Sequence, residues 1–249
     1  MSDTPWYRAF FGEDYLRIYT PFLPAEKAER EVADMLALLD LPSGSAILDL
    51  CCGTGRHALP LAERGYAVTG QDLNNEFLQQ IRQKAEEQGL SIRLVHSDMR
   101  IIPFEQEFDA IINIFTSFGY LENEEEDQQV LLQVQKALRP GGLFLLETVY
   151  QPRVLRSFSP YGIIHYSDGL IVLEERQIDL PRSRNDVRIT MIYPDGRRKE
   201  YHQSIRIYTL TELARMLAAA NLQLHAYYGN LDGSALTLDS RLVVLARKP

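Results

Sequence analysis

Residues 45–58 read Ser-Ala-Ile-Leu-Asp-Leu-Cys-Cys-Gly-Thr-Gly-Arg-His-Ala, and this stretch decides the fold. Ser45–Leu50 is a short apolar run, which predicts a buried strand. The strand ends in the turn Gly53-Thr54-Gly55, and Arg56–Arg64 then reads as a helix. Pro60 suits the first turn of a helix, where backbone N–H groups lack partners, so we expect the helix to begin near Arg56. Glycine lets a ligand approach the backbone, and the turn therefore predicts a nucleotide site, with a plain tight turn as the alternative.

Further strands and helices alternate along the chain. An apolar period in residues 27–39, Asn74 as a helix cap and Gly89 as a helix stop all indicate helices. Strand and helix alternate five times within residues 45–149, which predicts a doubly wound α/β sheet with helices on both faces. The expected strands after the first are Tyr66–Gly70, Ser91–His96, Phe108–Ile114 and Leu143–Thr148, followed near the end of the chain by Leu222–Tyr228 and Arg241–Ala246.

Residues 163–208 show a different pattern. Turn signals at Ser167-Asp168-Gly169 and Pro194-Asp195-Gly196 separate runs that are rich in β-branched and aromatic residues. We expect an antiparallel meander of three or four strands, inserted into the sheet domain. The runs are Gly162–Tyr166, Leu170–Leu180, Val187–Tyr193 and Arg198–Tyr208.

Composition and charge exclude several classes of protein. The chain has 249 residues, of which 45% are hydrophobic, so it can fill a core and is not a disordered chain. Its 34 acidic and 26 basic residues give a net charge of −8, which disfavours nucleic acid and anionic membranes as partners. We find no stretch of about 18 apolar residues and no basic start followed by an apolar run, so we expect neither a membrane span nor a signal peptide.

The two cysteines, Cys51 and Cys52, are adjacent. Neighbouring cysteines rarely form a disulfide, because the backbone between them is too short. The sequence also lacks metal-ligand spacing, so we expect no metal site, a reducing compartment and a cytoplasmic location.

Three aspartates lie on or just after expected strands. Asp72 lies 19 residues after Gly53, where an acid can bond the hydroxyls of a ribose, although it can also merely cap a helix. An NAD-binding protein would show the same pattern up to this point. Asp49, however, lies on the first strand, where an acid would repel pyrophosphate and would instead suit an ammonium group. Asp98 follows the third strand, where a carboxylate can accept a bond from an adenine amino group.

With these residues in place, the chain resembles the class I (Rossmann-like) S-adenosylmethionine-dependent methyltransferases, in their small-molecule branch. The resemblance covers residues 45–149 and the end of the chain at 209–247, and it implies a seven-stranded, mostly parallel sheet with a reversed last strand. The meander before the last helix and the run Asn113–Tyr120 resemble the small-molecule branch, which includes amino-sugar N-methyltransferases and glycine N-methyltransferase-like enzymes. The matching pieces are Asp49–Gly55, Asp72, Ser97-Asp98-Met99, Phe108–Ile111 and Leu138–Gly142.

The resemblance implies a role for each matching position. Asp49 and the turn Cys51–Gly55, with Gly53, Thr54 and Gly55, would hold the methionine part of S-adenosyl-L-methionine. Asp72 would take the ribose hydroxyls and Asp98 the adenine amino group. Leu73 and Met99 would lie against the adenine, and Phe115 would line the place where cofactor and substrate meet. The Cys51-Cys52 pair departs from the family's usual small residues, and we expect only a packing effect.

The resemblance further implies transfer of a methyl group to a nitrogen or oxygen of a small-molecule acceptor, by in-line displacement. The alternatives are a cofactor-binding protein without catalysis that acts as a partner or regulator, a protein or nucleic-acid methyltransferase, and an NAD-dependent oxidoreductase. A homodimer is compatible with the sequence. A general base would help a hydroxyl or ammonium acceptor. The candidates are Tyr120, Tyr150, His165 and His202, each of which can also be an ordinary surface or packed residue.

We expect three parts in the chain. Residues 1–40 form an N-terminal helical lid segment, 41–150 and 209–249 form the cofactor-binding domain, and 151–208 form an antiparallel cap that selects the substrate. The leading segment is dense in aromatic residues, which pack a short helix or close over the cofactor; Tyr7, Tyr15 and Tyr19 are the lid candidates. Three arginines of the cap region could bind an anionic substrate, but a solvated face is favoured: Arg153, Arg176 and Arg206.

Overall fold

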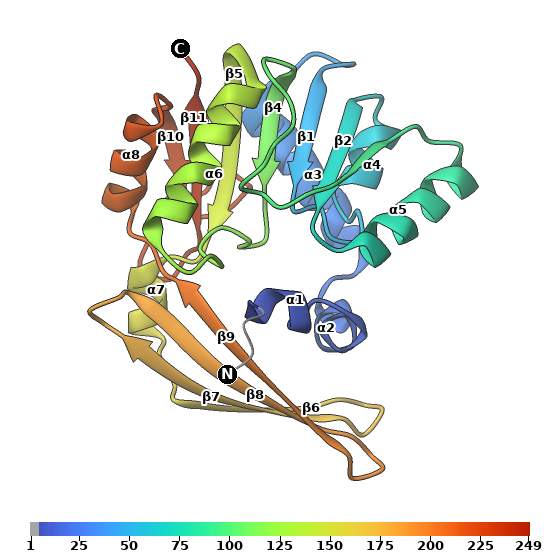
Figure 1. Cartoon of the computed structure of the whole chain (residues 1–249), viewed down its shortest axis with the longest axis vertical. Helices are drawn as coiled ribbons and strands as arrows, with labels where there is room; N and C mark the ends of the chain where they lie inside the picture. The colour runs from blue at the N-terminus through green and yellow to red at the C-terminus, as the bar shows by residue number, and fades with distance from the viewer. Residues whose placement is uncertain (1–4) are drawn as a thin grey trace.

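Two β-sheets organise residues 5–249, the part of the chain that the computed structural model describes (Figure 1). The strands of the larger sheet are β1 (Ala46–Leu50), β2 (Ala67–Asp72), β3 (Arg93–His96), β4 (Phe108–Asn113), β5 (Leu138–Thr148), β10 (Gln223–Tyr228) and β11 (Leu242–Arg247). They lie in the order β10-β11-β5-β4-β1-β2-β3, and β11 runs antiparallel to both of its neighbours. The predicted seven-stranded sheet with a reversed last strand is confirmed.

Helices cover both faces of this sheet because its strands are apolar on both sides. The helices are α3 (Ala25–Leu39), α4 (Ala58–Glu63), α5 (Asn75–Gln88), α6 (Glu124–Ala137) and α8 (Leu210–Ala219). Successive side chains of β1 point to opposite faces. Leu48 and Leu50 belong to the core under α6 and α8, whereas Ile47 belongs to the core under α3 and α4. Among residues 5–249, no helix is long and apolar enough to cross a membrane.

The starts of α4 and β5 differ from the sequence prediction. Helix α4 begins at Ala58 rather than near Arg56, since Arg56 and His57 continue the turn after β1. Strand β5 begins at Leu138, ahead of Pro140–Gly142, which we expected to precede the strand. The ladder to β4 is irregular there, and Gly142 accepts a bond from the N–H of Lys248, so the C-terminal segment holds these residues in the sheet.

The inserted meander forms a second, four-stranded antiparallel sheet. After α7 (Gln151–Arg156), its strands β6 (Tyr161–His165), β7 (Ile171–Asp179), β8 (Arg184–Ile192) and β9 (Arg198–Arg206) pair in chain order. This sheet lies beyond the carboxyl ends of the parallel strands, at the bottom of Figure 1. Parallel sheets bind their ligands at that end.

The N-terminal segment lies between the two sheets (Figure 1). It consists of α1 (Trp6–Phe10), α2 (Glu13–Tyr19) and η1 (Thr20–Phe22); residues 1–4 of the expected lid lie outside the described part of the chain. Phe10 and Ile18 are buried against the four-stranded sheet, in one cluster with Val172 and Ile189. The aromatic density of the segment therefore reflects packing on the inserted sheet.

Asp14 fastens this segment to the inserted sheet. Its carboxylate, only 9% exposed, accepts hydrogen bonds from Tyr193 Oη at 2.5 Å, Tyr201 Oη at 2.6 Å and Lys199 Nζ at 2.7 Å. Removing a buried acceptor leaves its donors unsatisfied, which costs more than the net value of the bonds themselves.

Replacing Asp14 with alanine should therefore lower the free energy of unfolding by about 1–3 kcal/mol and expose α1 and α2 to proteases. Urea unfolding and limited proteolysis would measure the two effects. The matched control is Asp168→Ala, because Asp168 pairs with Arg17 at an exposed position, where ion pairs contribute about 0–1 kcal/mol. If both variants lost the same stability, Asp14 would not be the anchor.

Candidate functional site

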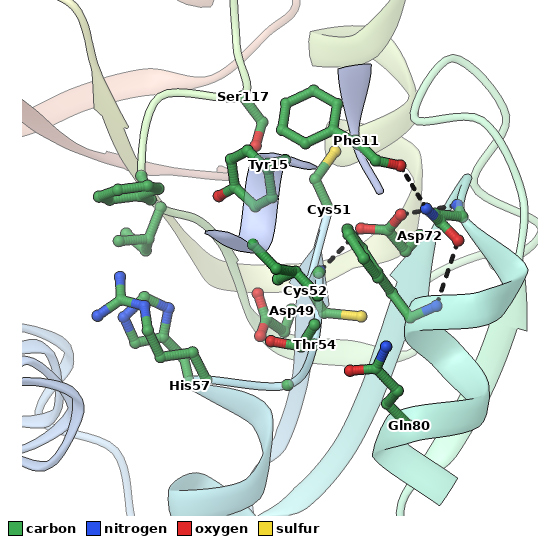
Figure 2. A pocket seen from close by; sticks show the side chains of 18 of the residues that line it. Phe11, Tyr15, Asp49, Cys51, Cys52, Thr54, His57, Asp72, Gln80 and Ser117 are labelled. Carbon is green, nitrogen blue, oxygen red and sulfur yellow. Dashed lines mark hydrogen bonds between the residues drawn. The ribbon is translucent and has the colours of Figure 1, made fainter. Parts of the chain in front are cut away.

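A cavity of about 1080 Å³ opens at the carboxyl ends of the parallel strands. Its walls come from the turn after β1, the loops after β2, β3 and β4, and the N-terminal segment. The structure brings every predicted cofactor residue and lid tyrosine to this cavity, and Figure 2 shows it from close by. They are Asp49, Cys51, Gly53, Thr54, Gly55, Asp72, Leu73, Asp98, Met99, Phe115, Tyr7, Tyr15 and Tyr19.

The turn after β1 places bare backbone against the cavity. Cys51, Gly53 and Gly55 all have positive φ angles, of 63°, 55° and 82°. A Cβ on Gly53 would meet no atom within 4 Å, so its backbone faces open space. A Cβ on Gly55 would lie 2.8 Å from Cγ1 of Ile81 on α5, so glycine is required there for helix packing. The first glycine therefore leaves room for a ligand and the second holds the turn in place.

Asp49 is a buried carboxylate with an unused oxygen. Its side chain is 2% exposed, and Oδ2 has no hydrogen-bond partner among the described residues. Burial raises the pKa of Asp49 to about 6, against the lowering effect of the nearby His57 and Arg56. A buried anion with an unpartnered oxygen is unfavourable, although a backbone hydrogen bond from Ala58 also lowers the pKa of Asp49. A cationic ligand group in the cavity would remove this penalty, which fits the ammonium expected there.

Asp72 holds the turn as well as lining the cavity. Its Oδ2 accepts a bond from the N–H of Gly53 at 2.8 Å, and its Oδ1 accepts one from the N–H of Asn74, also at 2.8 Å (Figure 2). Burial raises the pKa of Asp72, and these backbone bonds oppose the rise. The capping and ribose-binding interpretations are therefore compatible, because a carboxylate can accept more than two bonds.

Asp98 is held by its neighbour Arg100. The guanidinium donates through Nε at 2.9 Å to Oδ1 and through Nη2 at 2.8 Å to Oδ2. Burial alone would raise the pKa of Asp98, but the bonds from Arg100 keep it below its usual range. Asp98 is thus a fixed, ionised acceptor at the cavity wall, beside Met99.

The loop after β4 is held in a strained conformation. Phe115 and Thr116 both have φ angles of 69°, although neither is glycine. The N–H of Phe115 donates to Oε2 of the buried Glu147 at 2.9 Å, and Arg241 pairs with the other oxygen at 2.5 Å. The Phe115 ring lies 5.1 Å from the guanidinium carbon of Arg56. These contacts fix the ring at the cavity wall.

The N-terminal segment supplies the aromatic wall. The carbonyl oxygen of Phe11 accepts a bond from Nδ2 of Asn74 at 2.7 Å, which ties the segment to the loop after β2 (Figure 2). Tyr15 and Tyr19 are in aromatic contact with each other, with ring centroids 4.9 Å apart. Burial raises the pKa of Tyr15 to about 12 and also raises the pKa of Tyr19.

Of the four candidates for a general base, one lines the large cavity and three do not. Tyr120 lines the cavity, and burial raises its pKa well above the usual range. Tyr150, His165 and His202 are not part of the cavity wall; His202 instead lines a smaller cavity of about 570 Å³ beside Trp6.

The four-stranded sheet does not supply lining residues to the large cavity within residues 5–249. We expected the meander to roof the cavity, but α1 and α2 occupy that place because their apolar side chains pack on the sheet. Arg206 also differs from the favoured solvated face: its side chain is 11% exposed and pairs with Glu212 at 2.7 Å. Arg176 pairs with Glu174, and Arg153 is exposed on α7.

Sequence reasoning missed several residues of the wall, among them Arg56, His57 and Ser117. Arg56 and His57 directly follow Gly55, so their position was the available signal. Both bond Glu31 of α3, with His57 Nε2 at 3.0 Å from Oε2. Burial of Glu31 would raise its pKa, but His57 and Arg56 lower it to about 2, so Glu31 is an anion at neutral pH.

Asp49→Asn should stabilise the ligand-free protein by about 2–3 kcal/mol at pH 8, because a raised carboxyl pKa means that ionisation opposes folding. The sign follows from proton binding: the native state holds its proton up to about pH 6 and the unfolded chain releases it earlier, so stability falls as the pH rises. The gain should therefore shrink as the pH falls through 6, as urea unfolding at several pH values would show.

A matched control for this measurement is Asp109→Asn. Asp109 accepts bonds from the N–H of Ala46 and from Arg139, so its replacement should destabilise the protein. If Asp49→Asn were also destabilised, ionisation of Asp49 would not oppose folding, and the explanation given above would be wrong.

Comparison with known proteins agrees with this geometry. Residues 47–142 match the family model described as a methyltransferase domain. The YqeM protein of Bacillus subtilis (strain 168) is 37% identical over 108 residues, or 43% of each chain, so the match spans less than half of that relative.

Two longer matches extend the comparison. A dTDP-3-amino-3,6-dideoxy-alpha-D-glucopyranose N,N-dimethyltransferase of Streptomyces fradiae is 26% identical over 216 residues, covering 83% of this chain and 82% of the relative. The solved structure of the CcbJ methyltransferase from Streptomyces caelestis superposes with a TM-score of 0.83 at 21% identity, covering 96% of this chain and 98% of that one. The family match, the sheet order and the cavity at the ends of β1 and β4 lead to one conclusion: residues 47–142 match a methyltransferase domain, and the chain has the fold of the solved methyltransferase structure.

Proposed function

We propose that this protein transfers the methyl group of S-adenosylmethionine to the nitrogen of a small amine acceptor. The observation that carries the proposal is the set of aromatic rings and phenol groups in the cavity wall, which come from Phe115, Tyr15, Tyr19 and Tyr120. The amino-sugar N,N-dimethyltransferase of Streptomyces fradiae, which aligns over most of the chain, also supports an amine acceptor.

The cavity fits the cofactor at several independent points. Asp49 offers its unpaired Oδ2 to the ammonium, and Gly53 leaves open space above its backbone. Asp72 and Asp98 are the acceptors for the ribose hydroxyls and the adenine amino group, with Met99 beside the ring. When bound, the cofactor supplies a methyl group activated by a positively charged sulfur.

The residues of the chain then have to position the acceptor and exclude water. The N-terminal segment covers the cavity through Tyr15 and Tyr19, and the strained loop holds Phe115 opposite Tyr19, with ring centroids 6.5 Å apart. Positioning two reactants can contribute about 7–11 kcal/mol to a reaction barrier. Aromatic faces also attract positive charge, which is present throughout methyl transfer to an amine.

The same wall supports a nitrogen acceptor over an oxygen acceptor. A hydroxyl acceptor needs a base that removes its proton, whereas a neutral amine brings its own lone pair. The phenol of Tyr15 has a pKa of about 12, and burial raises the pKa of Tyr19 and Tyr120 as well. Such groups donate hydrogen bonds at neutral pH but do not accept protons, so they suit an acceptor that arrives deprotonated.

The other expected properties of the protein stay predictions. The net charge of −8 supports a small-molecule acceptor over nucleic acid. A homodimer and a cytoplasmic location are expectations from the sequence alone. Substrate selection by residues 151–208 would act through the N-terminal segment, which those residues hold in place. A cofactor-binding protein without catalysis is an outcome that the following assay distinguishes.

Paired acceptors test the proposal directly. Amines and alcohols that share one carbon skeleton, such as amino sugars and their parent sugars, are incubated with protein and S-adenosylmethionine, and S-adenosylhomocysteine is measured. We expect turnover with amines only, rising with pH until the acceptor's own ammonium has lost its proton. Turnover of the alcohols at a similar rate would contradict the amine assignment, and no turnover with any acceptor would favour the non-catalytic alternative.

Tyr15→Phe and Tyr120→Phe are the matched variants for this assay. If the phenols only pack and donate, both variants should keep the rising limb of the pH profile. A variant that lost this limb would identify its tyrosine as the base and would contradict the proposed mechanism.

A further inference from the structure

Asn74, the residue that caps α5, also makes a hydrogen bond that a helix cap does not need. Its Oδ1 accepts bonds from the N–H groups of Glu76 at 2.9 Å and Phe77 at 3.2 Å, which are ordinary capping contacts. Its Nδ2 donates at 2.7 Å to the carbonyl oxygen of Phe11 in the N-terminal segment (Figure 2). Serine, threonine or aspartate could supply the capping oxygen, but only asparagine adds an amide donor beside it.

This bond joins the N-terminal segment to the domain that holds the cofactor residues. Within residues 5–249, it is the one hydrogen bond between that segment and the domain of the larger sheet. The segment makes several bonds to the inserted sheet, where Asp14 accepts three and Tyr166 Oη donates to the carbonyl oxygen of Ile18 at 2.9 Å. The segment is therefore fastened firmly on one side, and on the other side its hydrogen bonding depends on Asn74.

Aromatic side chains of the segment meet the cavity wall at the same place. The ring of Phe11 is stacked on Tyr120, with centroids 5.6 Å apart and an angle of 26° between the planes. The ring of Tyr15 lies 6.3 Å from that of Phe77, in the first turn of α5. Asn74 and these four residues all line the large cavity. Aromatic pairs tolerate several geometries, so the directional bond from Asn74 is what fixes one of them.

Asn74 also contacts the residue that is expected to bind the ribose of the cofactor. Its backbone N–H donates to Oδ1 of Asp72 at 2.8 Å, so one residue joins Asp72, the start of α5 and the N-terminal segment. We propose that Asn74 is a positioning residue for methyl transfer, which holds the aromatic wall closed over the bound cofactor through Nδ2. The proposal rests on the cofactor of the proposed function but not on the nature of the acceptor.

Substitutions that keep the cap and remove the amide donor test this role. Asn74→Ser and Asn74→Asp both retain an oxygen that can cap α5. The aspartate has no donor, and the serine side chain is too short to replace the bond to Phe11. Asn123→Ser is the matched control, because Asn123 caps α6 through the N–H of Glu126 at 2.9 Å and, among the described residues, makes no hydrogen bond to the N-terminal segment.

Two measurements on the full-length protein report on the segment without turnover. Chasing labelled S-adenosylhomocysteine with excess unlabelled ligand gives its dissociation rate. Trp6, the one tryptophan of the chain, lies in α1 with its ring 4.9 Å from that of Tyr120, so acrylamide quenching of its fluorescence reports opening of the segment in the ligand-free protein. We expect both Asn74 variants to release the ligand about 2–10-fold faster, as the loss of one hydrogen bond implies, and to show stronger quenching. Asn123→Ser should match the wild type.

Several results would overturn the proposal. If Asn74→Asp matched the wild type and Asn74→Ser did not, the strength of the cap would be the cause. If only Asn74→Asp released the ligand faster, repulsion between the new charge and Asp72 would be the cause. If neither variant differed from Asn123→Ser, the bond to Phe11 would not hold the segment, and stronger quenching without faster release would mean that the segment does not cover the cofactor.

Failure of the proposed function would give a different result. A wild-type protein that did not bind S-adenosylhomocysteine would contradict the proposed cofactor. The quenching of Trp6 in the ligand-free variants would still show whether Asn74 holds the N-terminal segment in place.

Discussion

The buried carboxylate of Asp49, whose Oδ2 has no hydrogen-bond partner among the described residues, is the constraint around which the site is organised. Its backbone belongs to β1 at the centre of the sheet, so the oxygen cannot move out to water. The turn at Gly53 leaves room for a ligand directly after this strand, and His57 and Arg56 lie close enough to lower the pKa of Asp49. The ligand-free protein thus keeps an electrostatic penalty that a cationic ligand removes. Unfavourable energy of this kind in the ligand-free state is common at functional sites.

The inserted sheet serves the site indirectly. It holds the N-terminal segment through Asp14 and through the packing of Phe10 and Ile18, and that segment in turn covers the cavity. Asn74 ties the same segment to the loop after β2. The proposed effect of residues 151–208 on substrate selection would therefore act through the N-terminal segment, without any contact with the cofactor.

The sequence could predict what local patterns encode. Residue type and spacing predict the strand Ala46–Leu50, the glycine turn and the helix caps at Asn74 and Thr209. The alternation of strands and helices then predicts the doubly wound sheet. The sequence could not predict that the N-terminal segment would separate the meander from the cavity, because that depends on packing between residues more than 150 positions apart. The place of Arg56 in the cavity wall could not be predicted either, because it depends on contacts with Glu31 and Phe115, which are distant in the sequence.

Proton release on binding tests the central role of Asp49 most directly. Titration of S-adenosylhomocysteine in buffers of different ionisation enthalpy gives the protons released at each pH. Since the pKa of Asp49 is raised to about 6 in the free protein and an ammonium would lower it, we expect about half a proton released at pH 6, little at pH 8, and none for Asp49→Asn. Release that does not change with pH, or that persists in Asp49→Asn, would contradict the account.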